Sequence, residues 1–334
     1  MIRMKAKTVF VMLAALAMIV VAGLRIVAQT PSRSQQKPAG QQLVILDTDI
    51  GDDIDDAFAL ALLLRSPETK VLGVTTAFGD TALRARLVER YLAAVGRGQI
   101  PVEAGVAARG ANHVTQAAYA RQEPARPQGD AIAFLFREIR AHPGEITLIA
   151  IGPLFNEQAA IARDPATFRK LKRVVIMGGS VYRGYDDAKA GHAIQPPSPE
   201  WNIVCDPAGA RALLASGVPV FMMPLDSTQI HLTQPELGKI LSHGSPLTDQ
   251  LTLLYHEWAG SWAASDAWPM PTLFDPVAVS YAIRPELCPV QPMRLDVDDK
   301  GMTRPGPGPE NAQVCLKSDE AGFTELLLTR ILGD

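Results

Sequence analysis

Short strand-like runs alternate with amphipathic helical segments along most of the chain, and this alternation limits the folds open to it. Runs rich in β-branched and other apolar residues occupy 43–46, 71–77, 146–152, 173–179 and 218–224. Helical patterns occupy 55–65, 81–96, 156–164 and 207–216. Strands that alternate with helices indicate a mostly parallel sheet with helices on both faces. We therefore predict a single α/β domain with a Rossmann-like central sheet. Its C-terminal part contains helices at 251–264 and 275–283, a strand pair at 289–297 and 312–317, and a last helix.

The N-terminal residues have the pattern of an export signal. Arg3, Lys5 and Lys7 precede an uncharged apolar run at 8–24, and a small residue, Ala28, follows it. This order is typical of a secretory signal peptide, although the run is long enough to leave a membrane anchor open. The polar stretch rich in Pro, Ser and Gln that follows predicts a flexible linker over 29–42. We expect a folded domain over 43–334 that is exported, either periplasmic or secreted, or anchored at the membrane.

Charge and cysteine content exclude two other classes. The chain has 32 basic and 35 acidic residues, and the basic ones are scattered. A nucleic-acid partner is therefore not expected. The three cysteines, Cys205, Cys288 and Cys315, show no metal-binding spacing. Because their number is odd, we expect buried or half-buried thiols and no complete disulfide framework.

An acidic run follows the first predicted strand. The segment "LVILDTDIGDDIDDAFAL" (43–60) holds six aspartates between Asp47 and Asp56. Parallel sheets bind ligands at the carboxyl ends of their strands, where Asp80, Ile151 and Met177 also fall. Clustered carboxylates repel one another, and a hard cation such as Ca²⁺ or Mg²⁺ relieves that repulsion. A solvated helix cap would explain Asp55 or Asp56, but not Asp47 on the strand itself. The run therefore predicts a metal site.

Seven motifs resemble, in order, those of the inosine-uridine preferring nucleoside hydrolases. The first is "DTDIGDDIDDAFAL", and the others are "VTTAFGDT", "PVEAG", "LIAIGPLFN" with "VVIMGGS", "SPEWNIVCDPAGA" and "TLFDPVAV". The resemblance runs from about Leu43 to the C-terminus. It implies a hydrolase that cleaves the N-glycosidic bond of ribonucleosides, depends on Ca²⁺, and forms a homo-oligomer.

The resemblance also implies roles for individual residues. Ca²⁺ would be held by Asp49, Asp56, Asp275 and the carbonyl oxygen of Ile151, and the ribose hydroxyls would complete its shell. The substrate-binding residues implied are Asp55, Asp80, Met177, Glu200, Asn202 and Asp275. Cleavage builds an oxocarbenium-like sugar that carboxylates stabilise, and Ca²⁺ acidifies water only weakly. A carboxylate base is still needed, and Asp49, touching ion and water, is the predicted one.

The chain departs from the family pattern at several positions. Two extra residues lie between Gly51 and the Asp55–Asp56 pair, so Asp52 or Asp53 could replace Asp55 or Asp56 in the Ca²⁺ shell. Asp80 stands where the family usually has Asn. Phe274 occupies the position of a histidine that protonates the leaving base, and phenylalanine has no proton to donate. His256 or His231 could supply the proton, or Trp268 could stack on the base.

Two other functions stay open on the sequence alone. The loss of the histidine at Phe274 fits a calcium-dependent riboside-binding protein without turnover. The "LDTDIG" segment also imitates the nucleophile turn of haloacid-dehalogenase phosphatases, for which Thr75 or Thr76 could contact phosphate. That class also needs a lysine at a strand end, and none stands in a matching position.

Overall fold

The computed structural model describes residues 40–108, 114–127, 129–186, 191–261 and 269–333. The chain divides into two units, Met1–Gly40 and Gln41–Asp334. The predicted signal or anchor, and the linker up to residue 39, lie outside the described residues. Within the described ranges, no helix has the length and apolar character needed to cross a membrane.

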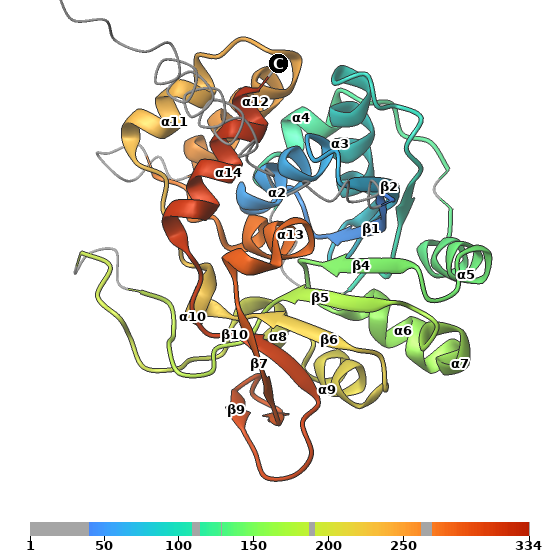
Figure 1. Cartoon of the computed structure of the whole chain (residues 1–334). Coiled ribbons are helices and arrows are strands. Elements are labelled where there is room, and N and C mark those ends of the chain that lie inside the picture. Colours follow the sequence, from blue (N-terminus) through green and yellow to red (C-terminus); the bar gives the residue numbers. More distant parts are fainter. Residues whose placement is uncertain (1–39, 109–113, 128, 187–190, 262–268, 334) are drawn as a thin grey trace, which may run out of the picture. The chain divides into compact units, whose positions relative to one another are not determined.

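One large sheet organises the second unit (Figure 1). In spatial order its strands are β3 (Val102–Ala104), β2 (Thr69–Thr76), β1 (Gln42–Thr48), β4 (Ile146–Ala150), β5 (Arg173–Met177), β6 (Val220–Met223), β10 (Ala312–Cys315) and β7 (Val290–Met293). The neighbours from β3 to β10 pair in parallel, and β7 pairs with β10 antiparallel. The predicted α/β fold with a mostly parallel sheet is confirmed, including the strand pair near the C-terminus.

Side chains on successive strand positions enter two apolar cores, one on each face of the sheet. Val44 and Leu46 of β1 belong to one core, and Ile45 between them belongs to the other. This alternation follows from the two-residue repeat of a strand. The first core is covered by α2 (Asp55–Leu64), α3 (Thr81–Ala94), α4 (Ala117–Arg121), α11 (Gln234–Leu241), α12 (Pro246–Ser261), α13 (Phe274–Ile283) and α14 (Glu320–Leu332). The second is covered by α5 (Ala131–Ala141), α6 (Phe155–Arg163), α7 (Pro165–Phe168) and α9 (Pro207–Ala215).

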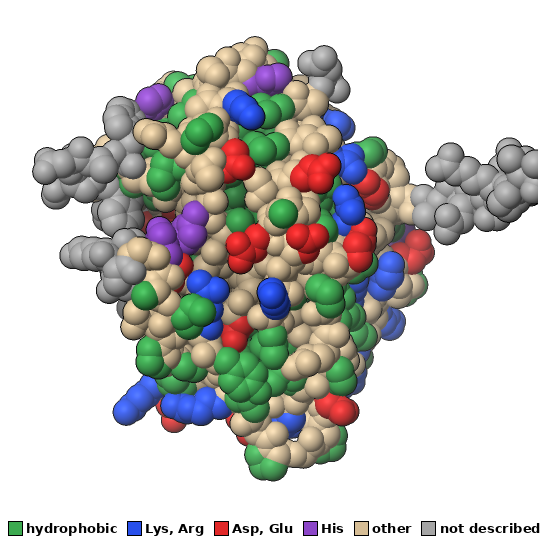
Figure 2. Space-filling view, turned by 60° about the vertical axis from the view of Figure 1, so that its left-hand side comes forward, with side chains coloured by type: hydrophobic (Ala, Val, Ile, Leu, Met, Phe, Trp, Pro, Cys, Tyr) green, Lys and Arg blue, Asp and Glu red, His purple; other side chains and the backbone are tan. Residues whose placement is uncertain are grey.

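Short elements complete the unit. They are α8 (Trp201–Cys205), α10 (Leu225–Thr228), the 3₁₀ turn η2 (Pro285–Leu287), and a hairpin of β8 (Leu295–Val297) and β9 (Thr303–Pro305). On the face in Figure 2, acidic and basic side chains are interspersed and form no continuous basic stripe.

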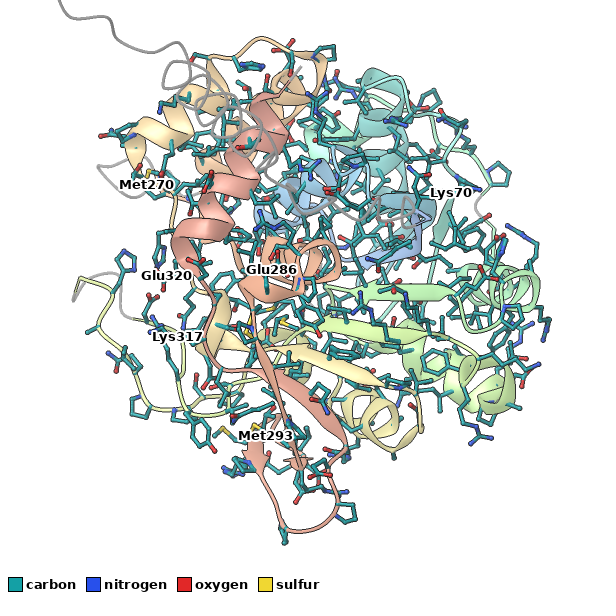
Figure 3. All side chains as sticks on the ribbon, viewed as in Figure 1. Lys70, Met270, Glu286, Met293, Lys317 and Glu320 are labelled. Atoms are coloured by element: carbon teal, nitrogen blue, oxygen red, sulfur yellow. A yellow bond between two sulfur atoms is a disulfide. The ribbon has the colours of Figure 1, made fainter. Side chains whose placement is uncertain are left out.

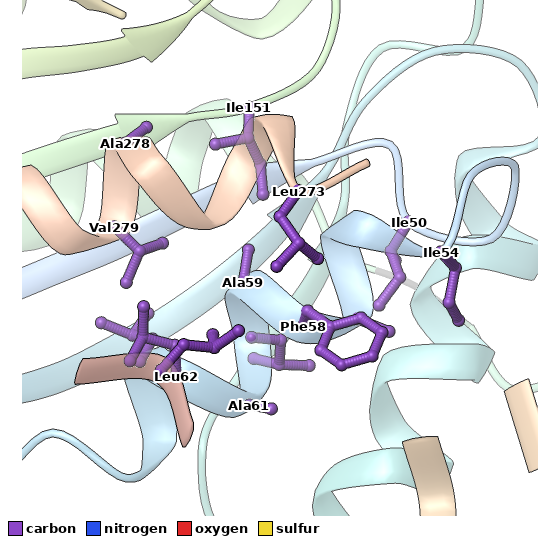
Figure 4. Close-up of a cluster of buried hydrophobic side chains, with 14 of the residues drawn as sticks. Ile50, Ile54, Phe58, Ala59, Ala61, Leu62, Ile151, Leu273, Ala278 and Val279 are labelled. Carbon is purple, nitrogen blue, oxygen red and sulfur yellow. The ribbon is translucent and has the colours of Figure 1, made fainter. Parts of the chain in front are cut away.

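Helices α2 and α13 pack closely because both are apolar on nearly every side. Every residue of α2 is buried, including the two aspartates of its first turn. Figure 4 shows Ala59 and Leu62 of α2 facing Leu273 and Val279 at α13. The packing brings the amino ends of two helices, far apart in sequence, to the carboxyl ends of β1 and β4.

The structure corrects the prediction for two cysteines. Cys288 and Cys315 form a disulfide, and only Cys205 is a free thiol among the described residues. The antiparallel pairing of β7 with β10 places Cys315 opposite Val290, two residues from Cys288. The sequence shows no sign of this because the pairing depends on the topology of the last strands.

We expect this disulfide to contribute strongly to stability. Its 27-residue separation closes a loop whose entropy in the unfolded chain is worth about 3.5 kcal/mol. The double variant Cys288→Ala/Cys315→Ala should lower the free energy of unfolding by about that amount in urea denaturation. Cys205→Ala, which removes a thiol but no crosslink, is the control. Equal losses in both variants would contradict the assignment.

Candidate functional site

A cavity of about 690 Å³ lies at the carboxyl ends of the central strands. Its lining consists of Asp49, Asp52, Asp53, Asp55, Asp56, Thr115, Ile151, Met177, Tyr185, Glu200, Trp201, Asn202, Trp258, Ser261, Phe274 and Asp275. A larger cavity, of about 940 Å³, lies near the amino ends of β1 and β2, where Lys70 is labelled in Figure 3. The described residues that line the larger cavity include no comparable group of buried carboxylates, so we assign the functional site to the smaller one.

Three buried aspartates form the centre of this cavity. Carboxylate oxygens of Asp55, Asp56 and Asp275 all lie within 4.8 Å of one another. The first two belong to the first turn of α2 and the third to the first turn of α13. The backbone N–H of Asp275 donates to Asp55 Oδ2 at 3.1 Å, and the Thr48 hydroxyl donates to Asp56 Oδ1. Helix N-termini favour such negative charge.

Burial makes the charged form of these groups unfavourable. Desolvation, reinforced by the neighbouring carboxylates, raises the pKa of Asp55, Asp56 and Asp275 well above the usual value. It also raises the pKa of Asp49 to about 6, although the nearby Arg84 guanidinium opposes that rise. One arginine therefore does not neutralise the site. A donor set made of oxygens, with excess negative charge, fits a hard divalent cation.

Glu200 and Asn202 are held by backbone groups at the strand ends. Glu200 Oε2 accepts the N–H groups of Gly179 and Ile203 at 2.9 and 3.1 Å, while desolvation raises the pKa of this carboxyl to about 7. Asn202 Nδ2 donates to the carbonyl oxygens of Ile151 at 3.0 Å and Met177 at 3.1 Å. A carbonyl has two lone pairs, so the Ile151 oxygen keeps one for another ligand.

Gly152 lets the end of β4 approach Asp49 closely. A Cβ atom at this position would lie 2.9 Å from both the backbone nitrogen and Oδ1 of Asp49. Such a contact would force the strands apart. The glycine after the strand, which the sequence shows in its "IGP" motif, is therefore a requirement of the site.

The structure places most predicted site residues on this cavity. Asp49, Asp55, Asp56, Ile151, Met177, Glu200, Asn202 and Asp275 all line it. Asp52 and Asp53 line it too, but the close cluster consists of Asp55, Asp56 and Asp275. Asp80 is exposed and caps α3, where it accepts the Leu83 N–H at 3.0 Å. Asp80 is not among the described lining residues, and its contact with substrate stays a prediction.

Arg84 is a site residue that the sequence analysis missed. Its side chain is fully buried, with Nη1 donating to the carbonyl oxygens of Asp49 and Ile50, the latter at 3.0 Å. Nε donates to the carbonyl of Phe78 at 2.9 Å, and Phe78 has a positive φ of 61°. The signal in the sequence that could have found it is a single arginine on the apolar face of α3. Through these hydrogen bonds, the Arg84 side chain links the turn after β1 to the turn after β2.

Aromatic side chains line the cavity beside the carboxylates. Tyr185 and Phe274 meet edge to face, with ring centroids 6.0 Å apart, and the Tyr185 hydroxyl oxygen accepts the Trp201 backbone N–H at 2.9 Å. Trp258 is buried between the cavity and the apolar core. Neither His231 nor His256 is among the described residues that line the cavity, and Trp268 lies outside the described residues. Tyr185 had no signal in the sequence, because the described residues around it, 178–186, contain no helix or strand.

Comparison with known proteins agrees with the fold. The profile of a family described as "Inosine-uridine preferring nucleoside hydrolase" matches residues 44–325. An uncharacterized protein of Schizosaccharomyces pombe is 30% identical, with 86% of this chain and 98% of that protein covered. The pyrimidine-specific ribonucleoside hydrolase RihA of Citrobacter koseri is 29% identical, with 86% and 97% covered.

A solved structure is similar as well. A plant nucleoside hydrolase superposes with a TM-score of 0.75 at 25% identity, over 88% of this chain and 99% of that one. The predicted family and enzyme class are thereby confirmed. The chain belongs to the inosine-uridine preferring nucleoside hydrolase family.

Proposed function

We propose that this protein hydrolyses the N-glycosidic bond of ribonucleosides in the carboxylate cavity, with Ca²⁺ bound there. The observation that carries the proposal is the buried group of Asp55, Asp56 and Asp275 beside Asp49 at the strand ends. The relatives support it, since one is named a ribonucleoside hydrolase and another a probable uridine nucleosidase. When bound, a hard divalent cation supplies positive charge that offsets the carboxylates and orients neutral oxygen ligands.

The residues of this chain suit the chemistry of the bond. As the C–N bond breaks, the sugar gains oxocarbenium character, and the surrounding carboxylates stabilise that positive charge. Glu200 and Asn202 are held rigidly enough to grip ribose hydroxyls. Asp49 is the general base: its ionised carboxylate accepts a proton from the attacking water.

The experiment that tests the proposal is a nucleoside panel. The purified protein would be incubated with uridine, cytidine, inosine and adenosine, with calcium or with a chelator, and the released ribose measured. We expect ribose from at least one nucleoside with calcium and none with the chelator. Binding of nucleosides without ribose release would support a riboside-binding protein instead.

One observation weakens the phosphatase alternative. Its nucleophile would be Asp47, the first aspartate of "LDTDIG". That side chain is fully buried, accepts hydrogen bonds from the Thr75 hydroxyl and from Asn156 Nδ2, and is not among the described lining residues.

We also propose that the chain is exported and works as a homo-oligomer. The charged, apolar and small-residue order of residues 1–28 supports export. The Cys288–Cys315 disulfide supports it independently, because disulfides persist in oxidising compartments. Cell fractionation tests the location and light scattering tests the assembly. Recovery of the intact chain from the cytoplasm would contradict export.

We expect calcium to stabilise the protein more as the pH rises. Folding raises the pKa of Asp49 from 3.8 to about 6, so its contribution to stability is complete below pH 3.8 and is lost as the pH rises through about 6. The ionised group then needs a counter-charge. The calcium-induced rise in melting temperature should be larger at pH 7.5 than at pH 5, by calorimetry. Equal rises would contradict this.

Tyr185 is the hydroxyl donor that we expect to assist the leaving base. Its oxygen accepts the Trp201 N–H, which leaves the hydroxyl proton free to point into the cavity. Tyr185→Phe should slow nucleoside cleavage by about 10- to 100-fold. Cleavage of p-nitrophenyl riboside, whose leaving group needs no proton, should change little. Tyr182→Phe, at an exposed tyrosine of the same loop, is the control. Equal losses on both substrates would assign Tyr185 to structure.

A further inference from the structure

Three metal-ligating side chains meet outside the carboxylate cavity. Asp186 and His192 belong to the loop after β5, and His231 follows α10. One atom from each lies within 4.8 Å of the other two. Asp186 Oδ2 is 3.1 Å from His231 Nε2 and 3.4 Å from His192 Nδ1. The two imidazole rings are neighbours, with centroids 3.9 Å apart.

These distances match the edges of a tetrahedral metal site. Bonds of about 2.0–2.1 Å from Zn²⁺ to nitrogen and oxygen place two tetrahedral ligands about 3.3–3.4 Å apart. Imidazole nitrogen favours Zn²⁺, Cu²⁺ or Ni²⁺, whereas Ca²⁺ prefers oxygen. The ligand set therefore differs in kind from the all-oxygen cavity.

Neighbouring groups hold the ligands in place. The Thr272 hydroxyl lies 3.0 Å from His231 Nδ1, which directs Nε2 of the same ring towards Asp186. The Asp186 backbone N–H donates to Gln229 Oε1 at 2.7 Å. Such outer contacts fix ring orientation in metal sites. Arg183 opposes binding, because its Nη2 lies 3.5 Å from the same Asp186 oxygen.

We propose that Asp186, His192 and His231 form a binding site for a transition-metal ion of the Zn²⁺ class, with solvent as a fourth ligand. The site connects the loop after β5 to His231, and through Thr272 to the segment that leads into α13. Tyr185, which precedes Asp186, and Phe274, which follows Thr272 by two positions, both line the carboxylate cavity. A metal ion bound at this site would fix the positions of Tyr185 and Phe274 beside the cavity.

The test is metal binding to the full chain, purified without a histidine tag and kept in excess calcium. Zn²⁺ would be titrated by calorimetry, and Co²⁺ would report the geometry by its absorption spectrum. We expect one Zn²⁺ per chain and a tetrahedral Co²⁺ spectrum. His192→Ala and His231→Ala should each weaken binding at least about tenfold, and Thr272→Val about tenfold. Arg183→Met should tighten it.

Two matched variants show where the metal binds. His243→Ala, at an exposed histidine outside the cluster, should bind Zn²⁺ like the unaltered chain. Asp56→Asn, in the carboxylate cavity, should also leave Zn²⁺ affinity unchanged. Loss of Zn²⁺ binding in Asp56→Asn, or full affinity in both His192→Ala and His231→Ala, would overturn the proposal. These readouts do not depend on nucleoside hydrolysis.

Discussion

Asp49→Asn should lower kcat for ribonucleosides by about a thousandfold, while calcium binding weakens far less. The amide keeps one oxygen that can face a cation, but it cannot accept a proton from water. Asp49 is buried and lines the cavity beside the Asp55, Asp56 and Asp275 cluster. Steady-state kinetics and calcium calorimetry on the same preparation would separate the two effects.

The pH profile gives an independent check on the same residue. A general base works in its ionised form, so activity should fall as the pH falls through the pKa of Asp49. That pKa is about 6 without a cation, and a bound cation lowers it, so the fall should come below pH 6. Asp299→Asn, at an exposed aspartate that is not among the described lining residues of the cavity, is the control and should keep both rate and profile. Near-normal turnover in Asp49→Asn would refute the assignment of the base.

The sequence predicts the parts of the fold that have a strong local pattern. The first strand, expected over 43–46, occupies Gln42–Thr48, and the helix expected over 275–283 occupies Phe274–Ile283. Both are mostly apolar segments next to polar or turn residues. The edge strand β3 is not among the predicted elements, because three partly buried residues carry no repeat.

The candidate site follows from the sequence where the chemistry is concentrated in one segment or one motif. Six aspartates in ten positions indicate a metal site by themselves. The strand-end motifs supply Ile151 and Met177, and the "SPEWN" motif at the start of α8 supplies Glu200 and Asn202. Parallel strands then bring these residues to one edge. Tyr185, in contrast, reaches the cavity through the path of an irregular loop. The Cys288–Cys315 disulfide depends on the pairing of β7 with β10, which no local pattern specifies.

Arg84→Met should cost both stability and activity. Three backbone carbonyls, those of Asp49, Ile50 and Phe78, would lose their donor in a buried place, which costs about 1–3 kcal/mol each before relaxation. We expect the free energy of unfolding to fall by about 3 kcal/mol in urea denaturation. Arg86→Met, in the same helix, removes donors only from the partly buried or exposed contacts to Glu123 and Arg121 and should cost less.

The activity effect of Arg84→Met separates an electrostatic role from simple support. Arg84 lowers the pKa of Asp49, so its removal should raise that pKa and move the acid limb of the pH–rate profile to higher pH. Arg84→Lys keeps the charge and should restore the limb, even if it restores stability only in part. A lost packing contact alone would lower the rate equally at all pH values. An unmoved acid limb in Arg84→Met would therefore show that Arg84 acts on the turn and not on the base.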